Sequence, residues 1–277
     1  MKLLDLLGRR KPYKWIREPK KIGGINFTDK VVEKINKKFT RLGYPVQPLN
    51  ISIQEYSDYF NSADYGNLYP HYYPYNIKEK SLEHYIAAKL LELGPQDIYI
   101  DIASEGSPVP EIYNRLFGVT SYRQDLTYPE GFNGNSIGGD AAKMPVPDEF
   151  ASQMALHCSL EHFEGDADTR FFQEAIRVLK PGGRVCVVPF YVHEKFSVLT
   201  DPNIVMTQTV EFDKGAVVYC VEGWGNRHGR FYDPRHFVDR IASAITNCKI
   251  QIFQIINAHE IDPSCYVRYA LLIEKVI

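Results

Sequence analysis

The chain has 277 residues, of which 44% are hydrophobic, and its formal net charge is −2 at pH 7. That hydrophobic content can bury a sizeable core, which excludes a chain that is disordered throughout. The near-neutral charge and the lack of a long basic run argue against a nucleic-acid partner. The length suits one large domain, or a domain with a cap.

The 5 cysteines are scattered without the Cys-x-x-Cys spacing that is typical of metal and redox sites. Most lie in apolar runs of strand length, which suits buried, reduced thiols and predicts a cytoplasmic protein. No apolar run approaches the roughly 18 residues that a membrane-spanning helix needs. Residues 1–11 could form a short amphipathic helix, which would either dock on the protein or contact a membrane surface.

We expect residues 1–80 to form a cap or substrate-binding region, and residues 81–277 to form a single domain with an insertion at about 190–232. Within the cap, residues 30–42 have apolar side chains at helical spacing, and Gly43 is placed to end that helix.

Residues 55–76 are rich in tyrosine and are interrupted by two prolines, which predicts irregular backbone. The rings could pack the cap onto the core. Alternatively some of them, with Tyr69 and Tyr73 as the candidates, could contact a substrate through ring stacking and hydroxyl groups.

A helix over 81–93 is predicted, with Ser81 as its N-cap and Gly94 with Pro95 as its stop. Beyond it, short apolar runs rich in β-branched residues alternate with helical patterns. We expect strands at 98–102, 119–122, 136–138, 153–157 and 184–188, and helices at 110–117 and 166–179.

After residue 189 the pattern loosens, with a strand-like stretch at 209–221 and a loop at 223–229. Asp233 then serves as the N-cap of a helix that continues to about residue 245. Two last strands, at 249–256 and 266–276, suit an antiparallel hairpin on the edge of a parallel sheet. The expected fold is α/β: a Rossmann-like, seven-stranded, mostly parallel sheet with a C-terminal antiparallel hairpin and helices on both faces.

Three acidic residues stand at or just beyond the ends of successive predicted strands: Asp101, Asp125 and Asp140. The carboxyl ends of parallel strands lie along one edge of a sheet, where such folds bind their ligands. This spacing therefore predicts a nucleotide-cofactor site at that edge.

The order of motifs over residues 81–188 resembles a class I S-adenosylmethionine-dependent methyltransferase of the small-molecule, methyltransferase-11-like type. The resemblance depends on Gly-Asp-Ala, Met-Pro-Val-Pro-Asp, Leu-Glu-His-Phe and Val-Leu-Lys-Pro-Gly-Gly, which follow one another in this order. It implies S-adenosyl-L-methionine as the cofactor and methyl transfer as the reaction.

In this family the first strand ends at an aspartate, matched by Asp101, and a glycine-rich loop follows, whose backbone approaches the methionine end of the cofactor. Here the loop is degenerate, because Ala103, Glu105 and Ser107 stand where glycines are usual and only Gly106 remains nearby. The Glu105 carboxylate could meet the carboxylate of the cofactor, point outward, or pair with the cofactor's ammonium group. The resemblance assigns cofactor binding in this motif to Asp101, Ala103, Ser104, Glu105 and Gly106.

The resemblance also implies roles for the later strand ends. Asp125, followed by Leu126, matches the acid that binds the ribose hydroxyls. Asp140 matches the acid that accepts from the adenine amino group, and the backbone of Ala141 would meet the edge of the adenine ring. The fourth motif begins at His157, which is also a candidate cofactor contact.

If the methyl acceptor is a hydroxyl, a base helps to remove its proton, and His157, His162 and His193 are the candidates. Each of them could instead be structural. His162 with Glu161 could form half of a metal site, but Cys158 stands where a further carboxylate would be needed, so no metal is expected.

The acceptor pocket is expected between the cap and the insertion, where Trp224, Arg227 and His228 would join Tyr69 and Tyr73. Aromatic rings with hydrogen-bonding neighbours suit a polar ring, and arginine suits an anionic group. The alternative for the insertion cluster is a well-packed loop.

These features favour O-methylation of a sugar or of a glycan or lipid precursor. Two alternatives stay open: a non-catalytic binding module with the same fold, and a membrane-associated lipid or quinone methyltransferase. The expected partner is a small-molecule acceptor rather than nucleic acid, and a homodimer and membrane contact through the N-terminus are left open.

Overall fold

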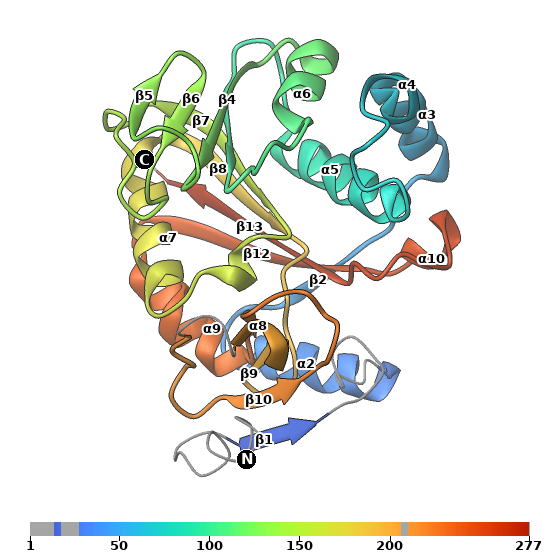
Figure 1. Cartoon of the computed structure of the whole chain (residues 1–277), viewed down its shortest axis with the longest axis vertical. Helices are drawn as coiled ribbons and strands as arrows, with labels where there is room; N and C mark the ends of the chain where they lie inside the picture. The colour runs from blue at the N-terminus through green and yellow to red at the C-terminus, as the bar shows by residue number, and fades with distance from the viewer. Residues whose placement is uncertain (1–13, 18–27, 206–209, 277) are drawn as a thin grey trace. The chain divides into compact units, whose positions relative to one another are not determined.

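The computed structural model describes residues 14–17, 28–205 and 210–276 of the chain (Figure 1). The amphipathic stretch expected over residues 1–11 lies outside the described residues. The chain divides into two compact units, each described by itself. The sheet unit comprises 46–159, 170–190 and 245–277, and the insertion unit comprises 1–45, 160–169 and 191–244.

The sheet unit is built on a nine-stranded sheet in the order β2-β12-β13-β8-β7-β3-β4-β6-β5. The central strands β8, β7, β3, β4 and β6 are mutually parallel, whereas β13 pairs antiparallel with both β8 and β12. The strand bounds are β2 Val46–Leu49, β3 Ile98–Ile102, β4 Thr120–Asp125, β5 Gly131–Asn133, β6 Ser136–Gly138, β7 Ala151–His157, β8 Leu179–Val188, β12 Cys248–Ile255 and β13 Tyr269–Lys275.

This arrangement confirms the predicted Rossmann-like α/β fold and the antiparallel pairing of the last two strands. Among the described residues the sheet has two edge strands beyond the seven expected. One is β2, which adds parallel to β12, and the other is β5, which forms a hairpin with β6. A one-turn helix, α10 (Ala258–Ile261), lies in the connection from β12 to β13, where only a short turn was predicted.

Helices cover both faces of the sheet: α5 (Ile77–Leu91) and α6 (Val109–Phe117) lie along one face, and α7 (Ala167–Val178) along the other (Figure 1). Side chains alternate along each strand, so a strand serves both faces. Tyr99 of β3, for example, belongs to the core packed against α5 and α6, while its neighbour Ile100 is buried on the opposite face.

The start of α5 differs from the prediction. Ser81 is not the N-cap, because the helix begins four residues earlier, at Ile77. The Ser81 hydroxyl is fully buried and contacts the Tyr56 hydroxyl at 2.8 Å, and it donates to the carbonyl of Lys78. The Ser81 side chain therefore forms a tertiary hydrogen bond instead of the N-cap bond that the local pattern predicted.

The first part of the tyrosine-rich stretch differs from the prediction, because it forms α3 (Ile53–Ala63) and α4 (Tyr65–Leu68), whereas residues 69–76 are irregular as predicted. Tyr56, Tyr59 and Tyr65 are buried in the same core as α5 and α6. These buried tyrosines thus pack in the core, which was the first of the two interpretations of the stretch.

The insertion unit contains a four-stranded sheet in the order β1-β10-β9-β11, in which only β11 runs antiparallel. Asp233 caps α9 as predicted, since its side chain accepts from the backbone amide of His236. The strand expected at 209–221 is confined to β10 among the described residues. The elements of this unit are β1 Lys14–Arg17, α2 Asp29–Arg41, the 3₁₀ turn Leu160–His162, β9 Ser197–Thr200, α8 Pro202–Val205, β10 Val217–Cys220, β11 Gly229–Phe231, α9 Pro234–Arg240 and the 3₁₀ turn Ala242–Ala244.

The two compact units do not follow the division expected at residue 80, because residues 46–80 group with the sheet. The functional division into a cap and a methyl-transferring domain stays a prediction. Among the described residues, no helix is long and apolar enough to cross a membrane.

A buried arginine holds the insertion unit together. Arg230 is 0% exposed, and its Nε and Nη2 donate to the two carboxylate oxygens of Asp213, both at 2.9 Å. Its remaining donors reach the carbonyls of Phe163 (2.6 Å) and Gly165 (3.0 Å), and Nη1 lies 3.1 Å from Asp168. A guanidinium is suited to this position because its planar fork satisfies several acceptors at once.

Replacing Arg230 with lysine should destabilise the insertion unit by about 2–4 kcal/mol, because an ammonium cannot reach all these acceptors. Both tryptophans, Trp15 and Trp224, belong to this unit, so urea denaturation followed by tryptophan fluorescence reports on it directly. The exposed Arg235→Lys is the matched control and should change little. Equal stability of the two variants would contradict a structural role for the Arg230 network.

Candidate functional site

The strand-end acids lie along one edge of the sheet unit. Asp101 is the penultimate residue of β3, Asp125 is the last residue of β4, and Asp140 follows β6 by two residues. Strand β4 pairs in parallel with both β3 and β6, so the three carboxyl ends are neighbours. The structure thus brings together the three acids that the sequence singled out.

The loop after β3 keeps a backbone that suits glycine, although most of its residues are not glycine. Ala103, Glu105 and Gly106 have φ angles of 52°, 36° and 76°. The left-handed region costs a non-glycine residue roughly 1–2 kcal/mol. Such a conformation persists only where the surroundings impose it.

Hydrogen bonds fix this loop to the end of β4. The backbone amide of Glu105 donates to Asp125 Oδ2 at 2.9 Å, and the amide of Ser104 donates to the carbonyl of Gln124 at 3.0 Å. The amide of Ala103 donates to the Gln124 side chain, whose own amide group donates to the carbonyl of Gly139 at 2.6 Å. Gln124 therefore joins the first loop to the loop that carries Asp140.

Gln124 was missed as a site residue in the sequence. Its signal was a polar residue directly before a strand-end acid, just beyond the predicted strand at 119–122. It is 1% exposed, so its amide group has to be satisfied by these backbone partners.

Asp125 is buried, and its side chain stabilises the turn that follows β4. Its Oδ1 accepts from the amide of Thr127 at 2.8 Å and from the Thr127 hydroxyl at 2.7 Å. Leu126, by contrast, is 74% exposed. A carboxylate oxygen has two lone pairs, so Oδ2, with one bond from Glu105, has a further acceptor position for a ligand hydroxyl.

Asp140 is more exposed than the other two acids. Its Oδ1 accepts from the backbone amide of Ala142 at 2.9 Å, and Arg170 reaches its Oδ2 at 3.2 Å. The adjacent Ala141 is 5% exposed. Because the Asp140–Arg170 pair is largely in solvent, it is weak and exchanges readily with a ligand group.

Asp101 is deeply buried at the base of the loop. The Tyr99 hydroxyl donates to its Oδ1 at 3.0 Å. Among the described residues, its Oδ2 has no hydrogen-bond partner. Burial raises the pKa of Asp101 to about 7.

His157, the first catalytic candidate, packs beneath Asp101. Its Nε2 lies 3.4 Å from the Tyr99 hydroxyl and 3.7 Å from Asp101 Oδ1, and its ring meets that of His84 edge-on at 4.8 Å. Burial lowers the pKa of His157 to about 3, so the ring is neutral at physiological pH. These contacts indicate that His157 helps to hold the Asp101 side chain in place. A role for His157 in taking up the acceptor's proton stays a prediction.

The other two candidate bases, His162 and His193, belong to the insertion unit rather than to the unit that holds the strand-end acids. His162 is partly exposed, and its Nδ1 lies 2.5 Å from the carbonyl of His228. His193 is buried, and burial lowers its pKa. Both roles stay predictions.

The expected acceptor residues of the insertion have partners within their own unit. Arg227 makes a two-pronged ion pair with Glu164, at 2.6 and 2.7 Å, and the buried His228 contacts the carbonyl of Glu161 at 2.9 Å. Trp224 packs beside Gly229, where a Cβ atom would lie only 2.3 Å from the indole. These contacts match the alternative of a well-packed loop.

Tyr69 and Tyr73 belong to the sheet unit. Tyr69 packs beside Tyr65, with ring centroids 6.4 Å apart, whereas Tyr73 is 52% exposed. The Nζ atom of Lys80 lies 5.4 Å from the centre of the Tyr73 ring. Lys80 is itself buried and bonded to both carboxylate oxygens of Glu83, a charged pair that the sequence analysis did not single out.

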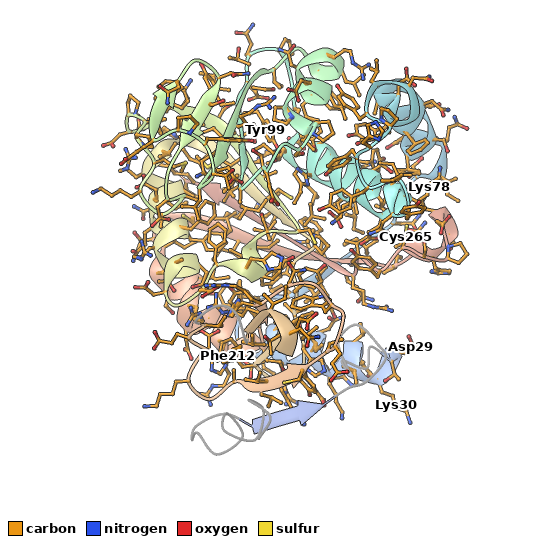
Figure 2. All side chains as sticks on the ribbon, in the orientation of Figure 1. Asp29, Lys30, Lys78, Tyr99, Phe212 and Cys265 are labelled. Carbon is orange, nitrogen blue, oxygen red and sulfur yellow. The ribbon has the colours of Figure 1, made fainter. Side chains whose placement is uncertain are left out.

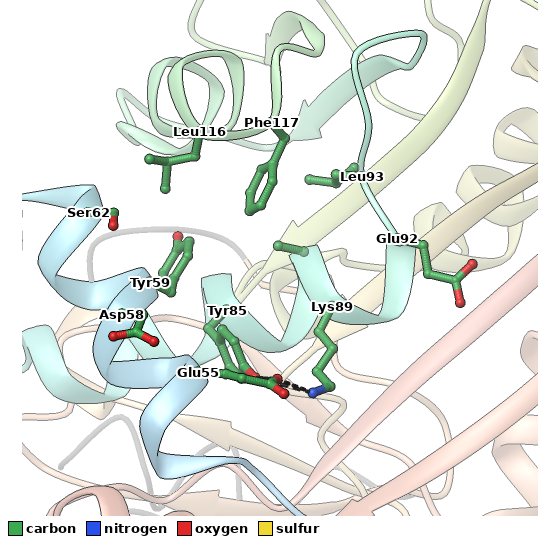
Figure 3. Close-up of a pocket in the computed structure, with 11 residues that line it drawn as sticks. Glu55, Asp58, Tyr59, Ser62, Tyr85, Lys89, Glu92, Leu93, Leu116 and Phe117 are labelled. Carbon is green, nitrogen blue, oxygen red and sulfur yellow. Dashed lines mark hydrogen bonds and ion pairs between the residues drawn. The ribbon is translucent and has the colours of Figure 1, made fainter.

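A separate pocket of about 460 Å³ lies between α3, α5 and the end of α6 (Figure 3). Leu93 and Phe117, on its wall, stand at the ends of helices that lead into the starts of β3 and β4. The pocket therefore lies at the amino edge of the sheet, and the strand-end acids lie at the carboxyl edge. No group of three or more His, Cys, Asp or Glu among the described residues is placed to hold a metal ion.

Residues 111–187 match the family model described as a methyltransferase domain. The matched segment runs from α6 into β8 and includes Asp125, Asp140 and His157. Residues 111–187 thus match a methyltransferase domain, in agreement with the resemblance that the sequence motifs carry. S-adenosyl-L-methionine is the cofactor that this resemblance implies.

No curated protein sequence matches the methyltransferase chain. Solved structures similar to it include 1,6-didemethyltoxoflavin-N1-methyltransferase of Burkholderia thailandensis with bound S-adenosylhomocysteine (12% identity, 84% of this chain and 94% of that chain, TM-score 0.48). PH0226 protein of Pyrococcus horikoshii OT3 is another (16% identity, 77% and 99% covered, TM-score 0.47). Geranyl diphosphate C-methyltransferase of Streptomyces coelicolor A3(2) is a third (13% identity, 75% and 87% covered, TM-score 0.45).

The loop residues of the methyltransferase domain can be tested by exchanging Glu105. Glu105→Gly keeps the amide that donates to Asp125 and suits the positive φ, so the free energy of unfolding should change by less than about 1 kcal/mol. Glu105→Pro removes the donor and fixes φ near −65°, which should cost about 3 kcal/mol. Chemical denaturation of both variants checks this, and equal stability would show that the loop does not depend on the Glu105–Asp125 bond.

The raised pKa of Asp101 makes stability depend on pH. The folded state keeps a proton that the unfolded state loses above the ordinary pKa of 3.8, so stability falls as pH rises from about 4 to about 7. Asp101→Asn removes this cost and should stabilise the protein by on the order of 2–4 kcal/mol at pH 8 and by far less at pH 4.5. Urea denaturation across this range, with the exposed Asp58→Asn as control, measures it; a gain that does not vary with pH would refute the buried-acid account.

Proposed function

We propose that this methyltransferase transfers the methyl group of S-adenosyl-L-methionine to a hydroxyl oxygen of a small-molecule acceptor, a sugar or a glycan or lipid precursor. The observation that carries the cofactor part is the bond between the Glu105 amide and Asp125. It holds a loop of non-glycine residues in a glycine-like conformation at the end of the first strand.

The residues present fit the cofactor. Asp125 has an acceptor position for a ribose hydroxyl, and Asp140 is exposed enough to accept from the adenine amino group beside Ala141. The buried Oδ2 of Asp101 has no partner among the described residues and would suit a cationic group. The cofactor supplies a sulfonium methyl as electrophile, and the protein positions the acceptor and excludes water.

The acceptor assignment is supported by the half-exposed ring of Tyr73, which offers a stacking surface and a hydroxyl beside the buried Lys80–Glu83 pair. Of the three candidate bases, His162 best suits proton uptake because its side chain is 37% exposed, whereas burial lowers the pKa values of His157 and His193. Arg227 is engaged with Glu164, so an anionic group on the acceptor would have to displace that carboxylate.

A second candidate is a binding module that has kept the fold without catalysis. It is favoured by the altered loop and by Asp125 Oδ1, which is already engaged twice by Thr127. Such a module would bind the cofactor or its product without transferring a methyl group.

Calorimetry with S-adenosylhomocysteine tests the cofactor site. The wild type should bind, and Asp125→Asn should weaken binding about tenfold or more, because hydrogen bonds to a carboxylate contribute about 1.5–3 kcal/mol. Asp148→Asn, at a 77% exposed side chain in the same unit, is the matched control. Absence of binding at millimolar ligand would contradict the enzyme and the cofactor-binding module alike.

The acceptor class is tested by incubating the protein and labelled S-adenosyl-L-methionine with fractionated cell extract. Label should enter the carbohydrate or lipid-linked carbohydrate fraction, and His162→Gln should reduce the rate at least tenfold without changing binding of S-adenosylhomocysteine. Incorporation into RNA or protein alone would overturn the proposed acceptor, and binding without incorporation would favour the binding module.

A further inference from the structure

A set of buried polar side chains surrounds Asp101 beneath the first loop of the sheet unit. Tyr99, which Figure 2 labels within the sheet unit, is 0% exposed and places its hydroxyl between Asp101 Oδ1, at 3.0 Å, and His157 Nε2, at 3.4 Å.

The hydrogen-bond directions in this set converge on Asp101. A carboxylate only accepts, so the Tyr99 hydroxyl donates to it. The Tyr99 oxygen can then accept from His157, which assigns the ring proton to Nε2. His157 therefore donates to Tyr99, and Tyr99 donates to Asp101 Oδ1, whereas Oδ2 has no partner among the described residues.

We propose that Tyr99 and His157 are positioning residues that hold the Asp101 carboxylate ready for the cationic amino-acid end of the cofactor, so that cofactor binding releases a proton from Asp101. This inference rests on the proposed cofactor site. A cation placed at the buried Oδ2 favours the ionised carboxylate, and the proton that the burial had retained leaves to solvent.

Several titratable or charged groups face Asp101 from the elements packed around it. They are Tyr99 on β3, His157 on β7, Arg123 and Asp125 on β4, Tyr113 on α6 and Tyr72 before α5. Burial raises the pKa values of the tyrosines and lowers that of His157 to about 3. Asp101, with its pKa near 7, is therefore the member of this set expected to exchange a proton near neutral pH.

Calorimetry in two buffers of different ionisation enthalpy counts the protons released when S-adenosylhomocysteine binds. The count should be about 0.9 at pH 6, about 0.5 at pH 7 and about 0.1 at pH 8, since Asp101 starts half protonated near pH 7. 5′-Methylthioadenosine, which shares the adenosine and thioether but lacks the amino-acid end, should bind without proton release. Asp101→Asn should bind S-adenosylhomocysteine more weakly, with no release at any of these pH values.

Two variants separate positioning from mere packing. Tyr99→Phe removes the donor to Asp101 and should move the midpoint of proton release to higher pH, and His157→Phe, which keeps the ring contact with His84, should do so to a smaller extent. Tyr113→Phe is the control, because Tyr113 is equally buried but its hydroxyl donates to the carbonyl of His84 at 2.6 Å rather than to Asp101. The control should leave the midpoint unchanged.

These measurements distinguish a failure of the role proposed for Asp101 from a failure of the proposed function. Absence of S-adenosylhomocysteine binding would overturn the cofactor site itself. Binding with no proton release between pH 6 and pH 8, or with equal release for 5′-methylthioadenosine, would overturn the role of Asp101 while leaving the cofactor site intact. A midpoint that shifts equally in Tyr99→Phe and Tyr113→Phe would assign the effect to lost packing.

Discussion

The hydrogen bond from the Glu105 amide to Asp125 is the constraint on which the candidate site depends. It joins the loop after β3 to the end of β4 and holds residues with side chains in backbone conformations that glycine adopts freely. Gln124 extends the same connection to the loop that carries Asp140. The neighbouring strand ends therefore hold the loop geometry, although Ala103, Glu105 and Ser107 stand where the family that the sequence resembles has glycines.

Burial of the Asp101 carboxyl group at this edge of the sheet lowers the stability of the folded state. A carboxyl group without exposure to water is destabilised in its charged form, and the hydrogen bond from Tyr99 compensates for this only in part. Such a group weakens the folded state progressively as pH rises from about 4 to about 7, which is unusual for a residue with only a structural task. A buried acid with an unsatisfied oxygen at the edge where ligands bind is consistent with strain retained for binding.

Strong local patterns in the sequence predicted the architecture well. The bounds of β3 and β6 were correct, and so was the Asp233 cap, because apolar β-branched runs and an Asp-Pro start depend on near neighbours. The cap at Ser81 and the irregular backbone expected before residue 69 were wrong for one common reason, a tertiary contact: Ser81 bonds to Tyr56, and Tyr59 and Tyr65 are buried in the core. The strand-end acids followed from topology, whereas the supporting roles of Gln124 and Tyr99 depend on partners distant in sequence.

The most direct test of the account is a crystal structure of the protein with S-adenosylhomocysteine. The ligand should lie at the carboxyl edge of the sheet, with its ribose on Asp125, its adenine beside Asp140 and Ala141, and its amino-acid end against the 103–107 loop. Ala103 and Glu105 should keep their positive φ angles, and the Glu105 amide should stay bonded to Asp125. A ligand bound elsewhere, or bound only after this loop has refolded, would contradict it.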